Sequence, residues 1–147
     1  MGFFKALDVG ASGLTAQRLR MDTISQNIAN VNTTRTENGT PYRRKDVVFQ
    51  ERKNTDSFST YLSNASGSID GGNGVRVTKI VEDTSEFKKV YDPGHPDADK
   101  DGYVSMPNVD VITEMVNMIS ATRSYEANVT SINATKSMAM KALEIGR

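Results

Sequence analysis

Both ends of the chain carry long amphipathic helix patterns, and this placement limits the folds that the chain can adopt. Residues 7–31 repeat an apolar residue every seven positions, and residues 109–145 alternate apolar steps of three and four. Both spacings place apolar side chains along one face of a helix, as in coiled coils. Helices at opposite ends of a sequence can pair with each other or with helices of neighbouring subunits. The pattern therefore predicts a helical core built from the two termini.

The N-terminal helix has a one-sided apolar stripe. One set of residues, spaced seven apart, is entirely apolar. A second set, each member three positions after a member of the first, is half apolar, and we call the two sets the first and second ladders. Asn30 and Asn32 predict its end, because asparagine tolerates the left-handed conformation found at helix termini. The first ladder is Leu7, Leu14, Met21 and Ile28, and the second is Gly10, Gln17, Ile24 and Val31.

The C-terminal helix has the stronger pattern. Pro107 precedes it, Asn108 or Asp110 is suited to cap its first turn, and Gly146 ends it. At about 1.5 Å per residue it would run roughly 55 Å, which favours contacts with other chains. A shorter second stripe makes its first half apolar over a wide arc, so this half should touch more than one neighbour. The main stripe is Val111, Met115, Met118, Thr122, Tyr125, Val129, Ile132, Lys136, Ala139 and Leu143, and the shorter one is Ile112, Val116 and Ile119.

Between the helices the sequence predicts short strands and loops. Residues 42–51, 75–82 and 87–91 are rich in valine, isoleucine, phenylalanine and tyrosine, which favour strands. Residues 52–73 are polar and rich in glycine, serine and asparagine, and they predict a mobile loop. The predicted fold is mainly α with a small β-rich middle, and its long terminal helices pair as a coiled coil. The predicted domains are a helical core of residues 1–33 and 106–147 and a β-rich segment of residues 34–105.

Composition excludes several classes of partner. The 147 residues include 18 basic and 18 acidic side chains, so no net positive charge steers the chain to nucleic acid or an anionic membrane. There is no cysteine, which excludes disulfides and thiolate sites. No run of 18 or more apolar residues appears, and residues 1–8 do not resemble a cleaved signal peptide. Ordinary signals would keep the chain in the cytoplasm, although an export machine that reads an uncleaved N-terminus would escape this test.

The sharpest local motif is an acidic loop near residue 100. Asp97, Asp99 and Asp101, followed by Gly102, match the first positions of a calcium-binding loop. The twelfth position is Asn108 instead of the usual bidentate glutamate, and prolines upstream exclude an entering helix. The plainer interpretation is an acidic turn that leads into a short strand. A small calcium-binding module is therefore the weaker alternative, with these aspartates as its metal candidates, and no cofactor is predicted.

Nothing in the sequence predicts catalysis. His95 is the one histidine of the chain, and it lies between a glycine and a proline. A catalytic histidine needs a group to activate or a partner that orients it. Asp92 and Asp97 are near in sequence, but no nucleophile candidate accompanies them. We therefore do not expect an enzyme.

Two segments near the N-terminus resemble the signature of the bacterial flagellar rod and hook proteins. They are SGLTAQ at residues 12–17 and ISQNIANVNT at residues 24–33. The whole axial family shares this signature, and later segments narrow the resemblance to a group of proximal rod proteins. The resemblance covers the chain apart from about residues 52–72, and the distal rod and hook members carry large middle domains that this chain lacks. The later segments are residues 41–43, 47–50, 102–111, 114–118, 121–128 and 136–138.

The resemblance implies a structural subunit of the proximal part of the flagellar basal-body rod. In that family the terminal helices form a coiled coil around the export channel, and the tube transmits torque. The implied location is the basal body, in the periplasm or cell-wall zone, reached without signal cleavage. The nearest alternative is another proximal rod protein of the same family. The implied partners are further copies of the chain, other proximal rod proteins, the rod-to-ring adaptor protein, the distal rod protein and the flagellar type III export apparatus.

The helix stripes are then the expected interaction surface of a rod subunit. The N-terminal ladder should pair with the C-terminal stripe, both within the subunit and across neighbours. The family also keeps a Pro-Gly-x-Pro turn near residue 95, so a loop that sets the start of the last helix explains the acidic motif without calcium. The candidate interaction residues are Leu7, Leu14, Met21, Ile24, Ile28, Val111, Met115, Met118, Tyr125, Val129, Ile132 and Leu143.

Overall fold

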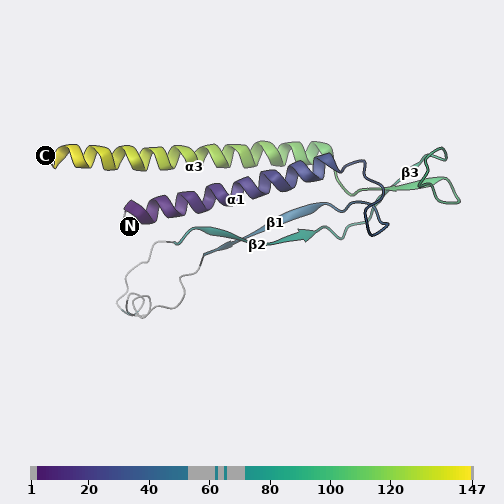
Figure 1. Ribbon diagram of the computed structural model, residues 1–147, viewed down its shortest axis with the longest axis horizontal. Helices are drawn as coiled ribbons and strands as arrows, with labels where there is room; N and C mark the ends of the chain where they lie inside the picture. Colours follow the sequence, from purple (N-terminus) through teal and green to yellow (C-terminus); the bar gives the residue numbers. More distant parts are fainter. Residues whose placement is uncertain (1–2, 53–61, 63–64, 66–71, 147) are drawn as a thin grey trace. The chain divides into compact units, whose positions relative to one another are not determined.

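Two long terminal helices flank a small β-rich middle in the computed structural model, which describes residues 3–52, 62, 65 and 72–146 (Figure 1). The predicted fold class is therefore confirmed. Most of the predicted mobile loop, residues 52–73, lies outside the described residues. The elements are α1 (Phe3–Ala29), β1 (Lys45–Glu51), β2 (Val75–Glu82), β3 (Lys88–Tyr91), β4 (Tyr103–Met106) and α3 (Val111–Ile145).

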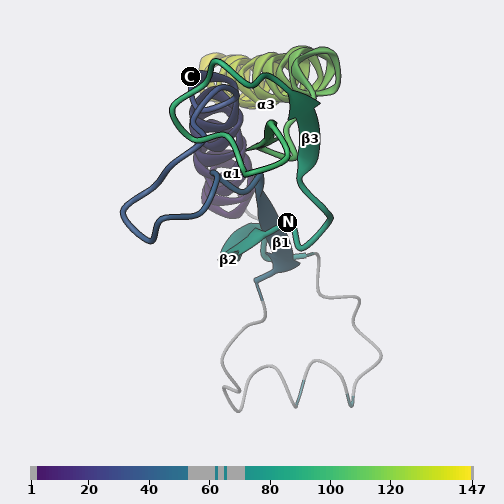
Figure 2. The same cartoon turned by 90° about the vertical axis from the view of Figure 1, so that its right-hand side faces the viewer.

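The strands form two-stranded sheets, β1 with β2 and β3 with β4. β1 and β2 lie side by side in both views (Figures 1 and 2). The amide of Arg52 donates to the Gly74 carbonyl at 2.9 Å, and that of Asp83 donates to the Arg44 carbonyl at 2.8 Å. The residue numbers rise on one strand as they fall on the other, so the two strands are antiparallel.

The β3–β4 hairpin is also antiparallel. Val90 lies opposite Val104, and Tyr91 opposite Tyr103. The two tyrosine rings meet edge to face with 5.4 Å between their centroids. β4 directly follows the acidic loop, as the plainer interpretation of that motif predicted. Composition alone had not marked these four residues as a strand.

The first predicted strand begins three residues later than expected. The sequence predicted residues 42–51, whereas β1 begins at Lys45. The amide of Tyr42 donates to the Thr33 carbonyl at 3.1 Å, and that of Arg44 donates to the Asn108 side chain at 2.8 Å. These two amides therefore donate to acceptors outside the sheet and not to a neighbouring strand.

Contacts divide the chain into two compact units, and both α1 and α3 run through both units. The first unit is Met1–Arg18, Phe49–Thr78 and Arg123–Arg147, and the second is Leu19–Val48 and Lys79–Thr122. Ala16 is the only buried side chain that the structure describes in the first unit, and the other buried side chains belong to the second. The sequence predicted a different division, into a helical core of the two termini and a β-rich middle segment, on the basis of helix and strand patterns. That division stays a prediction.

In the first unit, small residues of α1 allow a close approach of α3. A methyl group at Gly10 would lie 2.7 Å from Cγ1 of Ile132, and one at Gly13 would lie 2.9 Å from Nδ2 of Asn128. The α3 partner moves back along the chain as the α1 residue moves forward. The helix segments of this unit therefore pack antiparallel.

The helix segments of the second unit are also antiparallel. The hydroxyl of Thr122 donates to the sulfur of Met21 at 3.7 Å. The side-chain amide of Asn27 donates to Glu114 Oε2 at 2.9 Å. These contacts are compatible with the predicted coiled coil, whose supercoil stays a prediction.

We expect Gly74 to tolerate alanine less well than Gly39 does. Their φ angles are 88° and 74°, and an alanine in this region is strained by about 1 kcal/mol. A methyl group at Gly74 would also collide with the Ser12 hydroxyl, which accepts a hydrogen bond from the Val75 amide, whereas nothing lies within 4 Å of one at Gly39. Urea denaturation should show a loss of about 1 kcal/mol for Gly39→Ala and about 2–3 kcal/mol for Gly74→Ala. Equal losses would show that Ser12 moves aside without cost.

Candidate functional site

The second unit contains a buried polar cluster centred on Asn27 of α1. Asn27 and Glu114 are both 0% exposed. Nδ2 of Asn27 donates to the Lys45 carbonyl at 2.8 Å and to Glu114 Oε2 at 2.9 Å. Oδ1 of Asn27 accepts from the Tyr42 hydroxyl at 3.0 Å and from the Lys45 amide at 2.9 Å. The amide therefore uses its full hydrogen-bonding capacity, which offsets the cost of its burial.

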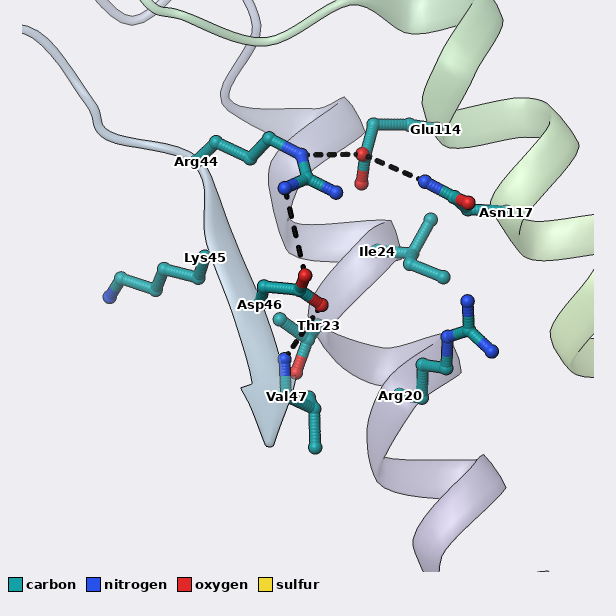
Figure 3. Close-up of a pocket in the computed structure, with 9 residues that line it drawn as sticks. All are labelled: Arg20, Thr23, Ile24, Arg44, Lys45, Asp46, Val47, Glu114 and Asn117. Atoms are coloured by element: carbon teal, nitrogen blue, oxygen red, sulfur yellow. Dashed lines mark hydrogen bonds and ion pairs between the residues drawn. The ribbon is translucent and has the colours of Figure 1, made fainter. Parts of the chain in front are cut away.

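Glu114 joins the cluster from the first turns of α3. Its Oε1 accepts from Nε of Arg44 at 2.8 Å and from Nδ2 of Asn117 at 3.4 Å (Figure 3). Figure 3 shows the guanidinium of Arg44 between Glu114 and Asp46. Its Nη1 lies 3.8 Å from the carboxylate of Asp46 and 4.0 Å from that of Asp83. The buried charge of Glu114 is thus paired and hydrogen-bonded, as buried ions require.

The surroundings also raise the pKa values of Tyr42 and Arg44. Burial raises the pKa of Tyr42, and the charges of Glu82 and Glu114 raise it further. Tyr42 therefore stays a hydroxyl donor to Asn27 at neutral pH. Burial alone would lower the pKa of Arg44, but its hydrogen bond to Glu114 and the nearby carboxylates raise that pKa above its usual value.

The segment before α3 is fastened to the same region. Oδ1 of Asn108 accepts from the Arg44 amide at 2.8 Å, and its Nδ2 donates to the Asp83 carbonyl at 3.1 Å. Asp110 caps the helix, since its carboxylate accepts from the Thr113 amide at 3.2 Å. Hydrogen bonds from Thr113 lower the pKa of Asp110. Of the two predicted cap candidates, Asp110 is therefore the cap, and Asn108 is an anchor.

The predicted interaction residues differ in exposure. Ile24 is buried, at 5% exposed. Three of them on α3 are exposed, namely Val111 at 38%, Met115 at 56% and Leu143 at 71%. Their part in contacts between subunits stays a prediction. The half-buried members are Leu7, Leu14, Met21, Ile28, Met118, Tyr125, Val129 and Ile132.

Sequence reasoning missed the polar centre of the second unit. Asn27 lies between Ile24 and Ile28 of the predicted stripe, and Glu114 directly precedes Met115. Asparagine is a poor former of helix interiors. An asparagine between two apolar positions of the helix was therefore the available signal, although it does not identify the partners of Asn27.

The first half of α3 presents an apolar face to solvent in the second unit. We call Ile112, Met115, Val116 and Ile119 the α3 apolar face, and their exposed fractions are 73%, 56%, 61% and 55%. Large exposed apolar patches mark interaction sites in soluble proteins. Neither α1 nor α3 has, among its described residues, a stretch long and apolar enough to span a membrane. On the exposed fractions of its four side chains, the α3 apolar face is a candidate protein-contact surface.

A second exposed apolar surface lies within the first unit, near the chain termini. Phe4, Met138 and Leu143 are 82%, 65% and 71% exposed. They line a shallow groove between the start of α1 and the end of α3. This groove is the second candidate contact surface.

Asp97 and the backbone of Asp99 in the acidic loop make contacts within the fold. The hydroxyl of Thr34 donates to Asp97 Oδ2 at 2.8 Å, and Arg35 lies 3.9 Å from Oδ1. The amide of Asp99 donates to the Tyr103 carbonyl at 2.9 Å, which closes the turn before β4. In the described part of the chain, no three side chains of histidine, aspartate or glutamate, Asp101 included, gather as metal ligands.

Comparison with known proteins assigns the family. The family described as "Flagella basal body rod protein" matches residues 7–35, and "Flagellar basal body rod FlgEFG protein C-terminal" matches residues 100–145. These regions contain Asn27 and Glu114, respectively. The chain is 58% identical to the flagellar basal-body rod protein FlgC of Bacillus subtilis, with 100% of both chains covered.

More distant relatives carry the same name. FlgC of Borreliella burgdorferi is 51% identical, with 99% of this chain and 98% of the relative covered. FlgC of Escherichia coli O6:H1 is 43% identical, with 100% of both chains covered. The similarity thus extends over nearly the entire chain in relatives from three bacteria. The chain therefore belongs to the FlgC family of flagellar basal-body rod proteins, which are structural subunits of that rod.

Proposed function

We propose that the chain forms part of the wall of the proximal rod, around the export channel, and transmits torque there. The observation that carries this proposal is the α3 apolar face. Ile112 and Val116 are 73% and 61% exposed on a helix that already contacts α1 in the second unit. Burying such side chains against neighbouring subunits contributes about 1.5–3 kcal/mol for each one that becomes fully buried. This gain favours assembly over the isolated subunit.

Membership of the rod family implies assembly with other rod components in the basal body. The finer assignments are part of the proposal. The partners are further copies of the chain, other proximal rod proteins, the rod-to-ring adaptor protein, the distal rod protein and the type III export apparatus. The rod zone is the periplasm or the cell wall, and the chain arrives without signal cleavage. A chain without cysteine can pass an export channel unfolded, because no disulfide holds it together.

The proposal also assigns roles along the chain. Residues 1–33 and 106–147 form the helical core of the assembled rod, and residues 34–105 pack outside it. The predicted interaction residues of both helices contact neighbouring subunits. The role is structural and includes no catalytic step.

Deletion of the gene and electron microscopy of the cells test this function. We expect cells without the chain to lack hooks and filaments, and a plasmid copy to restore both. Basal bodies isolated from the rescued cells should contain the chain on an immunoblot. Normal filaments in the deletion strain, or rescued basal bodies without the chain, would contradict the proposal.

A further inference from the structure

The apolar stripe of α1 fits more than one register against α3. Leu14, Met21 and Ile28 are seven residues apart, so a slide of about 10 Å along the helix places each where its neighbour was. The α3 stripe repeats at the same interval, so apolar contacts discriminate weakly between these registers in the second unit, whereas the close approach of α3 at Gly10 and Gly13 is specific to one register in the first unit. In the second unit, however, Met21 contacts Thr122 and Asn27 contacts Glu114. Some feature other than the apolar stripe must select this register.

We propose that Asn27 sets the register of α1. Its four hydrogen bonds reach two segments, the one from Tyr42 to Lys45 that leads into β1 and the start of α3 at Glu114. If α1 slides along α3 by one heptad, all four hydrogen bonds of Asn27 break together. Unlike the apolar contacts, these bonds are not regained one heptad away.

The residues one heptad from Asn27 cannot replace it. Seven positions before it lies Arg20, whose guanidinium only donates hydrogen bonds. The Tyr42 hydroxyl and the Lys45 amide are donors, and they would lose their acceptor in the buried site. Seven positions after it lies Thr34, beyond the end of α1 at Ala29. A single buried polar side chain fixes register in coiled coils by the same principle.

The receiving site does not depend on Asn27 for its charge balance. Arg44 donates to Glu114 and lies within 4.0 Å of Asp46 and Asp83. The ion pair therefore persists when α1 presents a different residue. Replacing Asn27 thus removes the selection of register and leaves the charged part of the cluster paired.

Introduced cysteine pairs report the register, because the chain has no cysteine of its own. Met21→Cys with Thr122→Cys reports the observed register. Met21→Cys with Met115→Cys or with Val129→Cys reports a slide of one heptad in either direction. In the purified full-length chain, only the first pair should form an intramolecular disulfide under mild oxidation. With Asn27→Leu, we expect a shifted pair to form at least about tenfold faster than with Asn27 present.

Gln26→Leu is the matched control, because Gln26 is an exposed neighbour on the same helix. This variant should form only the disulfide of the observed register. Exclusive formation of that disulfide in Asn27→Leu would overturn the proposal. If the cysteine pairs of Asn27→Leu react as they do in the urea-unfolded chain, the variant is unfolded and a second variant is needed. Asn27→Leu combined with Glu114→Leu fills both buried positions with apolar groups, and its disulfides are compared in the same way. If all three cysteine pairs form disulfides at equal rates in both Asn27→Leu and Gln26→Leu, substitution in this part of α1 disturbs folding in general. That result would also overturn the proposal.

Discussion

Replacing Glu114 by alanine should lower the free energy of unfolding by about 3 kcal/mol. The substitution leaves the buried Nδ2 of Asn27 with one acceptor fewer and takes the nearest carboxylate, at 2.8 Å, away from Arg44. Removing one partner of a buried ion pair typically costs about 3–5 kcal/mol. The expected loss is at the lower end because Asp46 and Asp83 still lie within 4.0 Å of Arg44.

Urea denaturation followed by circular dichroism measures this loss. Glu126→Ala is the matched control, because Glu126 is an exposed glutamate of the same helix. That change should alter the free energy of unfolding by no more than about 0.5 kcal/mol. Glu114→Gln keeps the size of the side chain and part of its hydrogen bonding, and it should fall between the two. A loss in Glu114→Ala equal to that in Glu126→Ala would show that the cluster contributes nothing to stability.

The sequence was sufficient to predict the helices because their signal is local. Leu7, Leu14, Met21 and Ile28 recur at a fixed interval, and α1 extends over all of them. The strands also follow local composition, and β2 has the predicted bounds, Val75–Glu82. The first strand was predicted too long because the Arg44 amide bonds Asn108, which lies 64 positions further along the chain. A local pattern carries no information on such a partner.

The polar cluster could not be predicted for the same reason. Asn27 and Glu114 are 87 positions apart, and Asn27 and Tyr42 are 15 apart. Each residue alone has an ordinary explanation in sequence terms, as an amide within a helix or a carboxylate in a first helical turn. Only the fold shows that they share one buried site. Most of the exposed α3 apolar face, by contrast, could be predicted from the sequence as the shorter second stripe. Apolar side chains recur at helical spacing whether the face they form is buried in a core or contacts another subunit.

The two features separate two tasks of a rod subunit. The buried cluster acts within the second unit, where Asn27, Tyr42 and Glu114 satisfy one another. The α3 apolar face begins on the same turns of α3 as Glu114 and points its side chains to solvent. Glu114 is 0% exposed and the adjacent Met115 is 56% exposed. The same helix segment can therefore hold the subunit together and offer a surface to its neighbours.

A charge on the α3 apolar face should strongly impair rod assembly without unfolding the subunit. Ile119 is 55% exposed, so Ile119→Asp should change the free energy of unfolding by no more than about 0.5 kcal/mol. In the assembled rod the same carboxylate would be buried without a partner, at a cost of several kcal/mol per subunit contact. We expect the fraction of cells with filaments to fall at least about tenfold, because about 1.4 kcal/mol already changes an equilibrium tenfold.

Asn133→Asp is the control for Ile119→Asp, because it adds the same charge at an exposed polar position of α3. Cells with this variant should keep their filaments. Urea denaturation of both purified variants separates an assembly defect from a folding defect. Loss of filaments with an unchanged urea midpoint assigns Ile119 to an interface. Normal filaments in Ile119→Asp would place the α3 apolar face outside the contacts that build the rod, and the terminal groove around Phe4, Met138 and Leu143 would then be the surface to test.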